Sequence, residues 1–171
     1  GGDNRVHLSE FDLIVEQRDL PSSTPIPDLS PERVEVTEVI GAYVSTLVND
    51  GDTIQIGTGT LSSCMGGYLM EKNDLGIDAE ILVASAIDLV KAGVATGRQK
   101  TYHPGLATGS FIVPGSDFAF CHEHPGIALY DIEWCNHLPR IATIRNLVAI
   151  NQASMIDLTG QAASESIGPV M

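Results

Sequence analysis

Two features in the first half of the chain could do chemistry together. One is the loop Gly57-Thr58-Gly59, which ends a short apolar run, and the other is the glutamate Glu80. Glycines permit unusual backbone angles and the close approach of a ligand, and amides at the start of a helix can receive an anion. A carboxylate half-buried beside such amides would be a functional group, whereas a tight turn and a solvated glutamate would not. The residue types alone leave both interpretations open.

The loop does not match the common nucleotide-binding patterns. A dinucleotide fingerprint would place its third glycine where Ser62 stands. A P-loop would continue with Gly-Lys-Ser or Gly-Lys-Thr, and neither follows. The spacing therefore leaves an anion-receiving loop or a plain strand-to-helix turn.

A single crossover unit would position the loop and the glutamate. Residues 53–56 form an apolar run before the loop, residues 81–84 form another directly after Glu80, and the segment between them suits a helix. Two parallel strands joined by a helix place loop and strand ends at one edge of the sheet. In open α/β sheets, ligands bind at that edge.

The rest of the chain predicts an α/β protein, because strand and helix patterns alternate through its first half. The clearest helix is expected at 31–49, where apolar residues recur at helical spacing on one face. That face consists of Val36, Val39, Ile40, Tyr43, Val44, Leu47 and Val48. Further elements are expected as follows: an edge strand and turn at 5–17, a Pro-rich connector at 18–31, a short helix at 85–93, a basic turn and strand at 97–102, strands at 106–113 and 127–130, a short helix at 116–123, and a hairpin of 147–151 with 155–158.

Composition bounds the class of protein. A chain of 171 residues is most simply one domain. A net charge of −13 argues against nucleic acid, which requires clustered Lys and Arg. No apolar run is long enough for a membrane helix and the start lacks a signal-peptide pattern, so we expect no membrane contact. Three cysteines without paired spacing favour reduced thiols and a cytoplasmic location.

Histidines and cysteines in the second half could be mistaken for metal ligands. They are Cys121, His122, His124, Cys135 and His137. Their spacings match no standard zinc pattern, so we expect no metal site.

Six segments, taken together and in order, resemble a known family. They are TIQIGTG, LGIDAE, DLVKAG, KTYHPG, NLVAINQA and DLTGQAASESIG. Their order and spacing are similar to the C-terminal half of the acetyl-CoA hydrolase/transferase family, which includes 4-hydroxybutyrate, butyrate and acetate CoA-transferases. The similarity covers most of the chain. It implies a class I CoA-transferase-like fold, with an open, largely parallel sheet flanked by helices.

The resemblance also implies a reaction. In the family, a glutamate attacks an acyl-CoA thioester and becomes a glutamyl-CoA thioester, and that glutamate matches Glu80. The substrates would be acyl-CoA and a short carboxylic acid, with coenzyme A carried as acyl-CoA. Amides of the loop Gly57-Thr58-Gly59 would stabilise the oxyanion or bind CoA, and a family asparagine matches Asn136, which could otherwise be a turn-forming residue.

The resemblance has departures and gaps. Leu61-Ser62-Ser63-Cys64 and Val83-Ala84-Ser85 stand where the family commonly has Pro with an acidic residue and Ser-Asp-Gly. We expect residues 1–30 to form an N-terminal strand and connector, and residues 31–171 to be a catalytic domain truncated at both ends. It would then need the missing N-terminal half of the same enzyme and is expected to form a homo-oligomer.

Three functions remain open at this point. They are an acyl-CoA:carboxylate CoA-transferase, an acetyl-CoA hydrolase, and a degenerate domain that binds CoA or a partner without catalysis. The basic candidates for CoA's phosphates are Arg98, Lys100, Arg140 and Arg145, for each of which a solvated surface position is expected.

Overall fold

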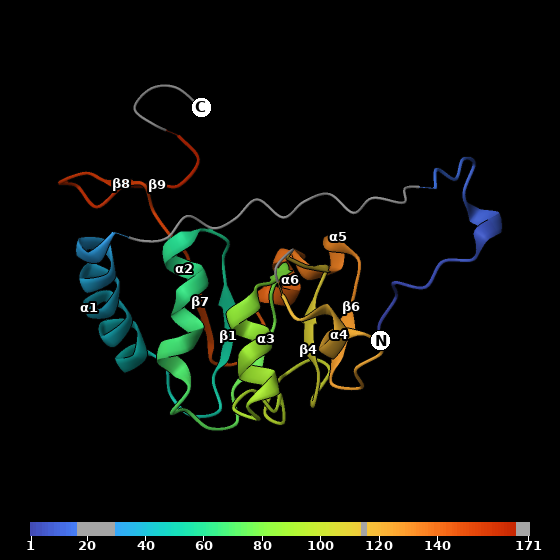
Figure 1. Cartoon of the computed structure of the whole chain (residues 1–171), viewed down its shortest axis with the longest axis horizontal. Helices are drawn as coiled ribbons and strands as arrows, with labels where there is room; N and C mark the ends of the chain where they lie inside the picture. The colour runs from blue at the N-terminus through green and yellow to red at the C-terminus, as the bar shows by residue number, and fades with distance from the viewer. Residues whose placement is uncertain (17–29, 114–115, 167–171) are drawn as a thin grey trace.

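The computed structural model of the chain describes residues 1–16, 30–113 and 116–166. Short strands alternate with helices along most of its length (Figure 1). The helices are η1 Leu8–Glu10, α1 Pro31–Leu47, α2 Thr60–Cys64, η2 Met65–Leu69, α3 Ala84–Lys91, α4 Phe118–Cys121, α5 Ile132–Cys135 and α6 Leu138–Ile141. The strands are β1 Thr53–Ile56, β2 Gly76–Ile77, β3 Ile81–Leu82, β4 Ala107–Gly109, β5 Phe111–Ile112, β6 Ile127–Leu129, β7 Leu147–Ile150, β8 Met155–Ile156 and β9 Ala162–Ala163.

The strands form one open, largely parallel arrangement. β1 pairs in parallel with β2 on one side and with β7 on the other. β3 pairs in parallel with β5, and β4 with β6. A parallel bridge between Asp78, just after β2, and Thr108 of β4 joins these pairs into one sheet. The order across the sheet is β7, β1, β2/β3, β4/β5, β6. The α/β class and the parallel sheet predicted from the sequence are confirmed.

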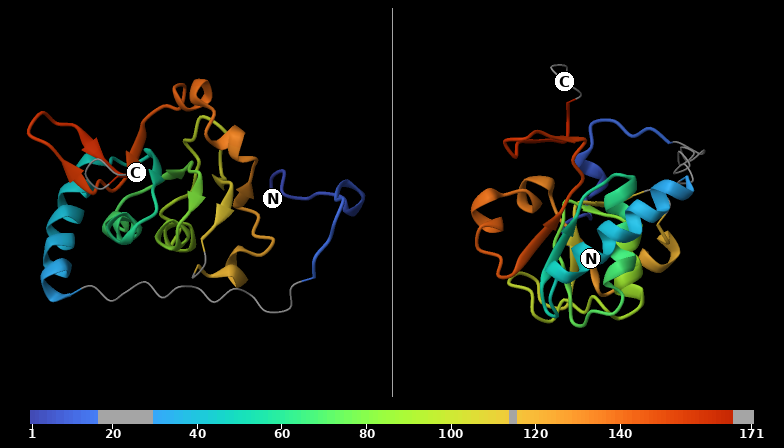
Figure 2. Two further views of the ribbon diagram at one scale, coloured as in Figure 1. Left: turned by 90° about the horizontal axis from the view of Figure 1, so that it is seen from above. Right: turned by 90° about the vertical axis from the view of Figure 1, so that its left-hand side faces the viewer.

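Helices cover both faces of this sheet. α1, α2 and α3 lie on one face and α5 and α6 on the other (Figure 2). The first face is the more deeply buried, because Ile54 and Leu82 from the strands pack with Met65, Leu69 and Ile87 from the helices. Burial of these aliphatic side chains is the main source of stability for the scaffold that holds the loops.

Helix α1 agrees with the sequence in extent but not in the face that it buries. Val48, just after its end, is fully buried, but Val36, Val39, Tyr43 and Leu47 are exposed. The prediction of one apolar face covered by a sheet was therefore too broad. The helix packs at the edge of the structure against η2, so only one side of its apolar surface finds a partner.

Several local predictions were wrong. Residues 5–16 form no strand, and the 3-10 turn η1 begins after His7, whose side chain accepts a hydrogen bond from the Ser9 amide. Residues 97–102 form turns and no strand. The connector predicted at 18–31 lies outside the described residues apart from its last two positions.

The hairpin predicted for residues 147–158 was also wrong. β7 pairs with β1 as the edge strand of the sheet, with Thr53 opposite Leu147 and Ile56 opposite Ile150. β8 instead pairs in antiparallel fashion with β9. Closeness in the sequence favours a local hairpin. Pairing of β7 with β1 instead buries more apolar surface and forms a longer hydrogen-bonded ladder.

Candidate functional site

Glu80 directly precedes a strand, as the sequence predicted, because β3 begins at Ile81. A shorter strand, β2, comes before Glu80 on the same path, where Gly76 and Ile77 pair with Thr53 and Ile54 of β1. This register places Glu80 level with the loop that follows β1. The glutamate and the glycine loop therefore meet at the carboxyl ends of two neighbouring strands, where α/β sheets bind ligands.

The carboxylate of Glu80 is free to act. The residue is half-buried, and its side chain forms no hydrogen bond or ion pair with any residue in the part of the chain that the structure describes. Its backbone is held, since its carbonyl accepts a hydrogen bond of 2.7 Å from the Ser110 amide. The side chain thus projects from a fixed backbone into open space.

That space is a polar hollow of about 390 Å³. Glu80 and the loop residues Gly57 and Thr58 line it together. The remaining lining residues are Gln55, Ile56, Ile81, Asn151, Gln152, Ser164 and Glu165. Glu80 and the glycine loop therefore converge on one cavity at the edge of the sheet.

The loop is held by side chains that follow β7. Asn151 exchanges two hydrogen bonds with Gln55, and Gln152 accepts one of 3.1 Å from the Leu61 amide. A Cβ at Gly57 would collide with the Asn151 side chain, so this close approach requires glycine. Gly59 has φ +128, a conformation that other residues rarely adopt.

The loop amides are not equivalent. Gly57 donates its N–H to Ile150 in the sheet ladder, at 2.9 Å. The amides of Thr58 and Gly59 have no hydrogen-bond partner among the described residues, and both residues are exposed. Only the second and third residues of the loop therefore have donors left for a ligand.

A second hollow, of about 330 Å³, opens on the other side of Glu80. Asn136, which follows α5, lines it together with Glu80, and so does Arg140 of α6. Most of its remaining lining is apolar, from Ala79, Cys135, Ile141, Ile144, Leu147 and Ala149. The structure therefore brings Asn136 and Glu80 to one cavity, while Thr58 lies in the adjoining one.

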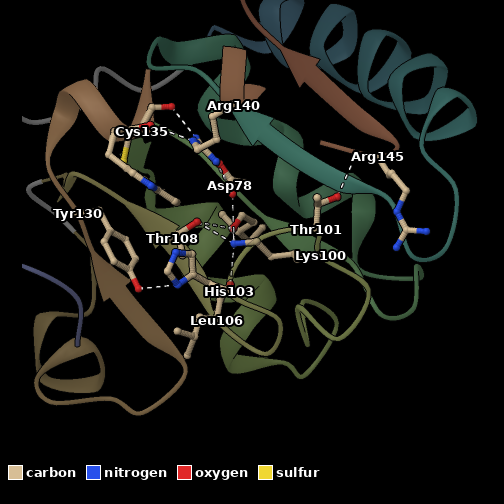
Figure 3. Close-up of polar contacts among 12 residues, drawn as sticks. Asp78, Lys100, Thr101, His103, Leu106, Thr108, Tyr130, Cys135, Arg140 and Arg145 are labelled. Atoms are coloured by element: carbon tan, nitrogen blue, oxygen red, sulfur yellow. Dashed lines mark hydrogen bonds and ion pairs between the residues drawn. The ribbon is translucent and has the colours of Figure 1, made fainter. Parts of the chain in front are cut away.

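A buried ionic cluster lies two residues before Glu80. The side chain of Asp78 is 3% exposed and binds the Arg140 guanidinium through both oxygens, at 3.0 and 3.2 Å (Figure 3). The same guanidinium donates to the carbonyls of Trp134 and Cys135. Arg140 also lies over the Trp134 ring, 4.0 Å from its centroid. Bidentate, stacked geometry of this kind is specific to arginine.

Lys100 completes the cluster from the opposite side. Its Nζ lies 3.5 Å from the Asp78 carboxylate and donates to the carbonyls of Ile77 and Leu106 and to the Thr108 hydroxyl. Burial lowers the pKa of Lys100 to about 8, although the neighbouring Asp78 charge opposes the shift. Lys100 and Arg140 are therefore internal, and the prediction of surface positions for them was wrong.

The other two basic candidates are exposed, as predicted. Arg98 lies 3.7 Å from Asp74, away from both hollows. Within the described part of the chain, Arg145 contributes only its backbone amide to a hydrogen bond, with Thr101.

Aromatic side chains surround the cluster. His103 shares a hydrogen bond of 2.8 Å with the Tyr130 hydroxyl and packs edge-on against Trp134. Burial, followed by the charge of Lys100, lowers the pKa of His103. Two segments that carried the family resemblance, LGIDAE and KTYHPG, thus meet at one place beside Trp134.

The cluster and the Asn151–Gln152 pair were not predicted from the sequence. The cluster gave no local signal, because its charged residues are distant in sequence. Asn151 could have been found, since it directly follows a strand, but the predicted hairpin placed that strand elsewhere. Of the departures from the family pattern, Leu61, Ser62, Cys64 and residues 83–85 line neither hollow, and Val83 is buried in the core.

The remaining sequence expectations concern cysteines, metals and membranes. All three cysteines are free. Among the described residues, no three His, Cys, Asp or Glu side chains gather as metal ligands would, and no helix is long and apolar enough to cross a membrane.

Comparison with known proteins places the chain. Residues 116–171 match the acetyl-CoA hydrolase/transferase C-terminal domain family. The chain is 34% identical to the 4-hydroxybutyrate coenzyme A transferase of Clostridium kluyveri over 98% of its own length and 38% of that protein. It is likewise 34% identical to a succinyl-CoA:cyclohexane-1-carboxylate CoA transferase of Geobacter metallireducens, with the same coverage.

Solved structures agree with the sequence matches. RipA from Yersinia pestis superposes with a TM-score of 0.81 at 34% identity, over 95% of this chain and 36% of that one. The 4-hydroxybutyrate CoA-transferase from Porphyromonas gingivalis gives a TM-score of 0.82 at 28% identity, over 95% and 41%. The chain thus spans well under half the length of the relatives that it matches. It has the CoA-transferase fold, and its sequence resembles the C-terminal domain of the acetyl-CoA hydrolase/transferase family.

Proposed function

We propose that this chain carries the nucleophile of an acyl-CoA:carboxylate CoA-transferase, and that the nucleophile is Glu80. The observation that carries the proposal is the position of the Glu80 carboxylate, which has no partner among the described residues and lines one hollow with the glycine loop. A carboxylate in this setting keeps its lone pairs available for attack. The family matches reported above support the same reaction class.

The reaction would proceed by successive acyl substitutions. A Glu80 oxygen attacks the thioester carbonyl of acyl-CoA and the carbon–sulfur bond breaks. CoA departs as a thiolate, and Glu80 is then joined to the acyl group as a mixed anhydride. The thiolate then attacks the glutamyl carbonyl, and the anhydride carbon–oxygen bond breaks to release the first carboxylate. A second carboxylate attacks the resulting glutamyl-CoA thioester, and the returning thiolate forms the new acyl-CoA and restores Glu80.

Each substitution passes through a tetrahedral oxyanion that needs hydrogen-bond donors. The amides of Thr58 and Gly59 are free to donate, and Asn136 can offer its side-chain amide from the second hollow. Gly57 would instead let the substrate approach the backbone closely, because its amide is already hydrogen-bonded to the Ile150 carbonyl. Donors fixed by the fold stabilise such an oxyanion without reorganising during the reaction.

The substrate class follows from the relatives. The names of these CoA-transferases describe transfer of CoA to acetate, butyrate, 4-hydroxybutyrate, succinate or cyclohexane-1-carboxylate. We propose that this protein also uses an acyl-CoA and a carboxylic acid. Since the relatives are much longer than the matched region, we propose that an upstream domain and further downstream segments complete the hollow around Glu80 and bind the CoA phosphates.

Covalent capture tests the assignment of Glu80. The full-length protein is incubated with an acyl-CoA, treated with borohydride to reduce the thioester, digested, and mapped by mass spectrometry. We expect reduction at Glu80, none in Glu80→Gln, and unchanged capture in the control Glu71→Gln, an exposed glutamate outside both hollows. Capture at Glu165, which lines the same hollow, would contradict the assignment.

Transfer and hydrolysis share the glutamyl-CoA thioester, so the acceptor separates them. We expect consumption of acyl-CoA to depend on added carboxylate. Release of free CoA at the same rate without any added acid would assign a hydrolase. A domain without catalysis would show neither capture nor turnover.

A further inference from the structure

Arg140 connects two parts of the candidate site that are far apart in the sequence. One part is the strand gap that carries Glu80, and the other is the end of α5, which carries Asn136. Its guanidinium holds Asp78 with two hydrogen bonds and the carbonyls of Trp134 and Cys135 with two more. Asn136 is the next residue after Cys135, and Glu80 is two residues after Asp78. A single planar side chain thus fixes both backbones.

The surroundings make this connection rigid. Arg140 is 7% exposed, and the Trp134 ring covers its guanidinium. On the far side, Lys100 holds Asp78 and, through the Ile77 carbonyl, the strand before it. The guanidinium therefore has little freedom to move without moving Asn136 or the Glu80 backbone. Lysine could not replace it, because an ammonium group lacks the fixed fork needed to reach a carboxylate and two carbonyls at once.

We propose that Arg140 is a positioning residue, which sets the side-chain amide of Asn136 relative to the Glu80 carboxylate across their shared hollow. The inference rests on the proposed function, since it concerns the same reaction. Arg140 does not itself touch the reacting atoms in this scheme. It acts through Asn136, and a displacement of about 1 Å at a catalytic group can cost roughly 100-fold in rate.

The test compares Arg140→Lys with Arg145→Lys in the full-length protein. Both changes keep the charge, but Arg145 is exposed and its side chain makes no contact with the site. We expect Arg140→Lys to lower kcat by about 10-fold to 100-fold with little change in KM for acyl-CoA, because ground-state binding is not its role. Arg145→Lys should retain the wild-type kcat. A wild-type kcat in folded Arg140→Lys would overturn the proposal.

A double-mutant cycle separates positioning from general structural support. Asn136→Ala removes the donor that Arg140 is proposed to position and should lower kcat by about 10²-fold to 10³-fold. If Arg140 acts through Asn136, adding Arg140→Lys to Asn136→Ala lowers kcat little further. If the two losses multiply, Arg140 supports the site in some other way and the proposal fails.

Two further measurements keep the outcomes distinct. Thermal melting of each variant shows whether it is folded at the assay temperature. If Arg140→Lys is not folded, Asp78→Asn replaces it in the same cycle. This substitution keeps the shape of the side chain and one oxygen for Arg140, but it weakens the contact. An active Glu80→Gln would mean that the proposed function has failed. An inactive Glu80→Gln with multiplying losses in the cycle would reject only the role of Arg140.

Discussion

Two carboxylates, Asp78 and Glu80, stand two residues apart on one strand path and line the same hollow in opposite environments. Asp78 is buried and has contacts with two cations, Lys100 and Arg140. Glu80 is half-buried and has no partner among the described residues. The Asp78 oxygens are bound by the two cations, whereas the Glu80 oxygens remain available to a ligand. The difference separates a carboxylate that stabilises the fold from one that can react.

The largest expected effect follows from removing the reactive carboxylate. Glu80→Gln should lower CoA transfer by roughly 10⁴-fold or more, because loss of a nucleophile removes the covalent route. Since no contact is lost, stability should change by no more than about 0.5 kcal/mol. Steady-state assays and urea denaturation would measure both. A large loss of stability would show that Glu80 has the structural role assigned here to Asp78.

The converse substitution should act on stability. Asp78→Ala leaves the charges of Lys100 and Arg140 buried without their counter-ion, so we expect a loss of about 3–5 kcal/mol in the free energy of unfolding. Urea denaturation measures it, with Asp88→Ala, an exposed aspartate on α3, as the matched control. Equal stability of the two variants would refute the contrast between the two carboxylates.

The buried cluster should also give stability a dependence on alkaline pH. The pKa of Lys100 is about 8 in the folded protein and 10.5 ordinarily, so between these pH values the unfolded chain binds more protons. Stability should therefore rise by about 3 kcal/mol as the pH increases from 8 to 10.5, at about 1.4 kcal/mol per pKa unit. Lys100→Gln should lack this rise. Denaturation of both proteins across this range is the measurement, and parallel curves would contradict the prediction.

A smaller effect is expected in acid. Burial lowers the pKa of His103 below 6.5, so in the pH range just below 6.5 the unfolded chain again binds more protons. The melting temperature should fall as the pH decreases from 7 to 5, and it should fall less in His103→Gln. Equal slopes for the two proteins would show that burial and the nearby Lys100 charge do not lower the pKa of His103.

Sequence patterns predicted the parts of this molecule that depend on local order. Apolar runs located β1 and β6, and helical spacing located α1 and α3, because each pattern spans a single element. The glycine loop and Glu80 could be singled out by residue type. Their convergence depends on the β1–β2 register, which begins at Gly76, four residues before Glu80.

The remaining features depend on distant pairing. Lys100 and Arg140 look like surface residues in the sequence, and only the tertiary structure brings them to one aspartate. The exposed side of α1 was predicted to be buried because apolar spacing does not say how wide a face its neighbour covers. β7 was assigned to a hairpin because periodicity identifies a strand without naming its partner.

The pairing of β7 with β1 has a consequence for folding. Gln55 and Asn151, which brace the glycine loop, lie 96 residues apart in sequence. Contacts this distant form late, because a long segment must be ordered before they can close. During synthesis the loop cannot reach its final shape until the ribosome has released the segment beyond Ile150. Nascent chains halted earlier should expose β1 and bind chaperones, which would be the first sign that this site is assembled last.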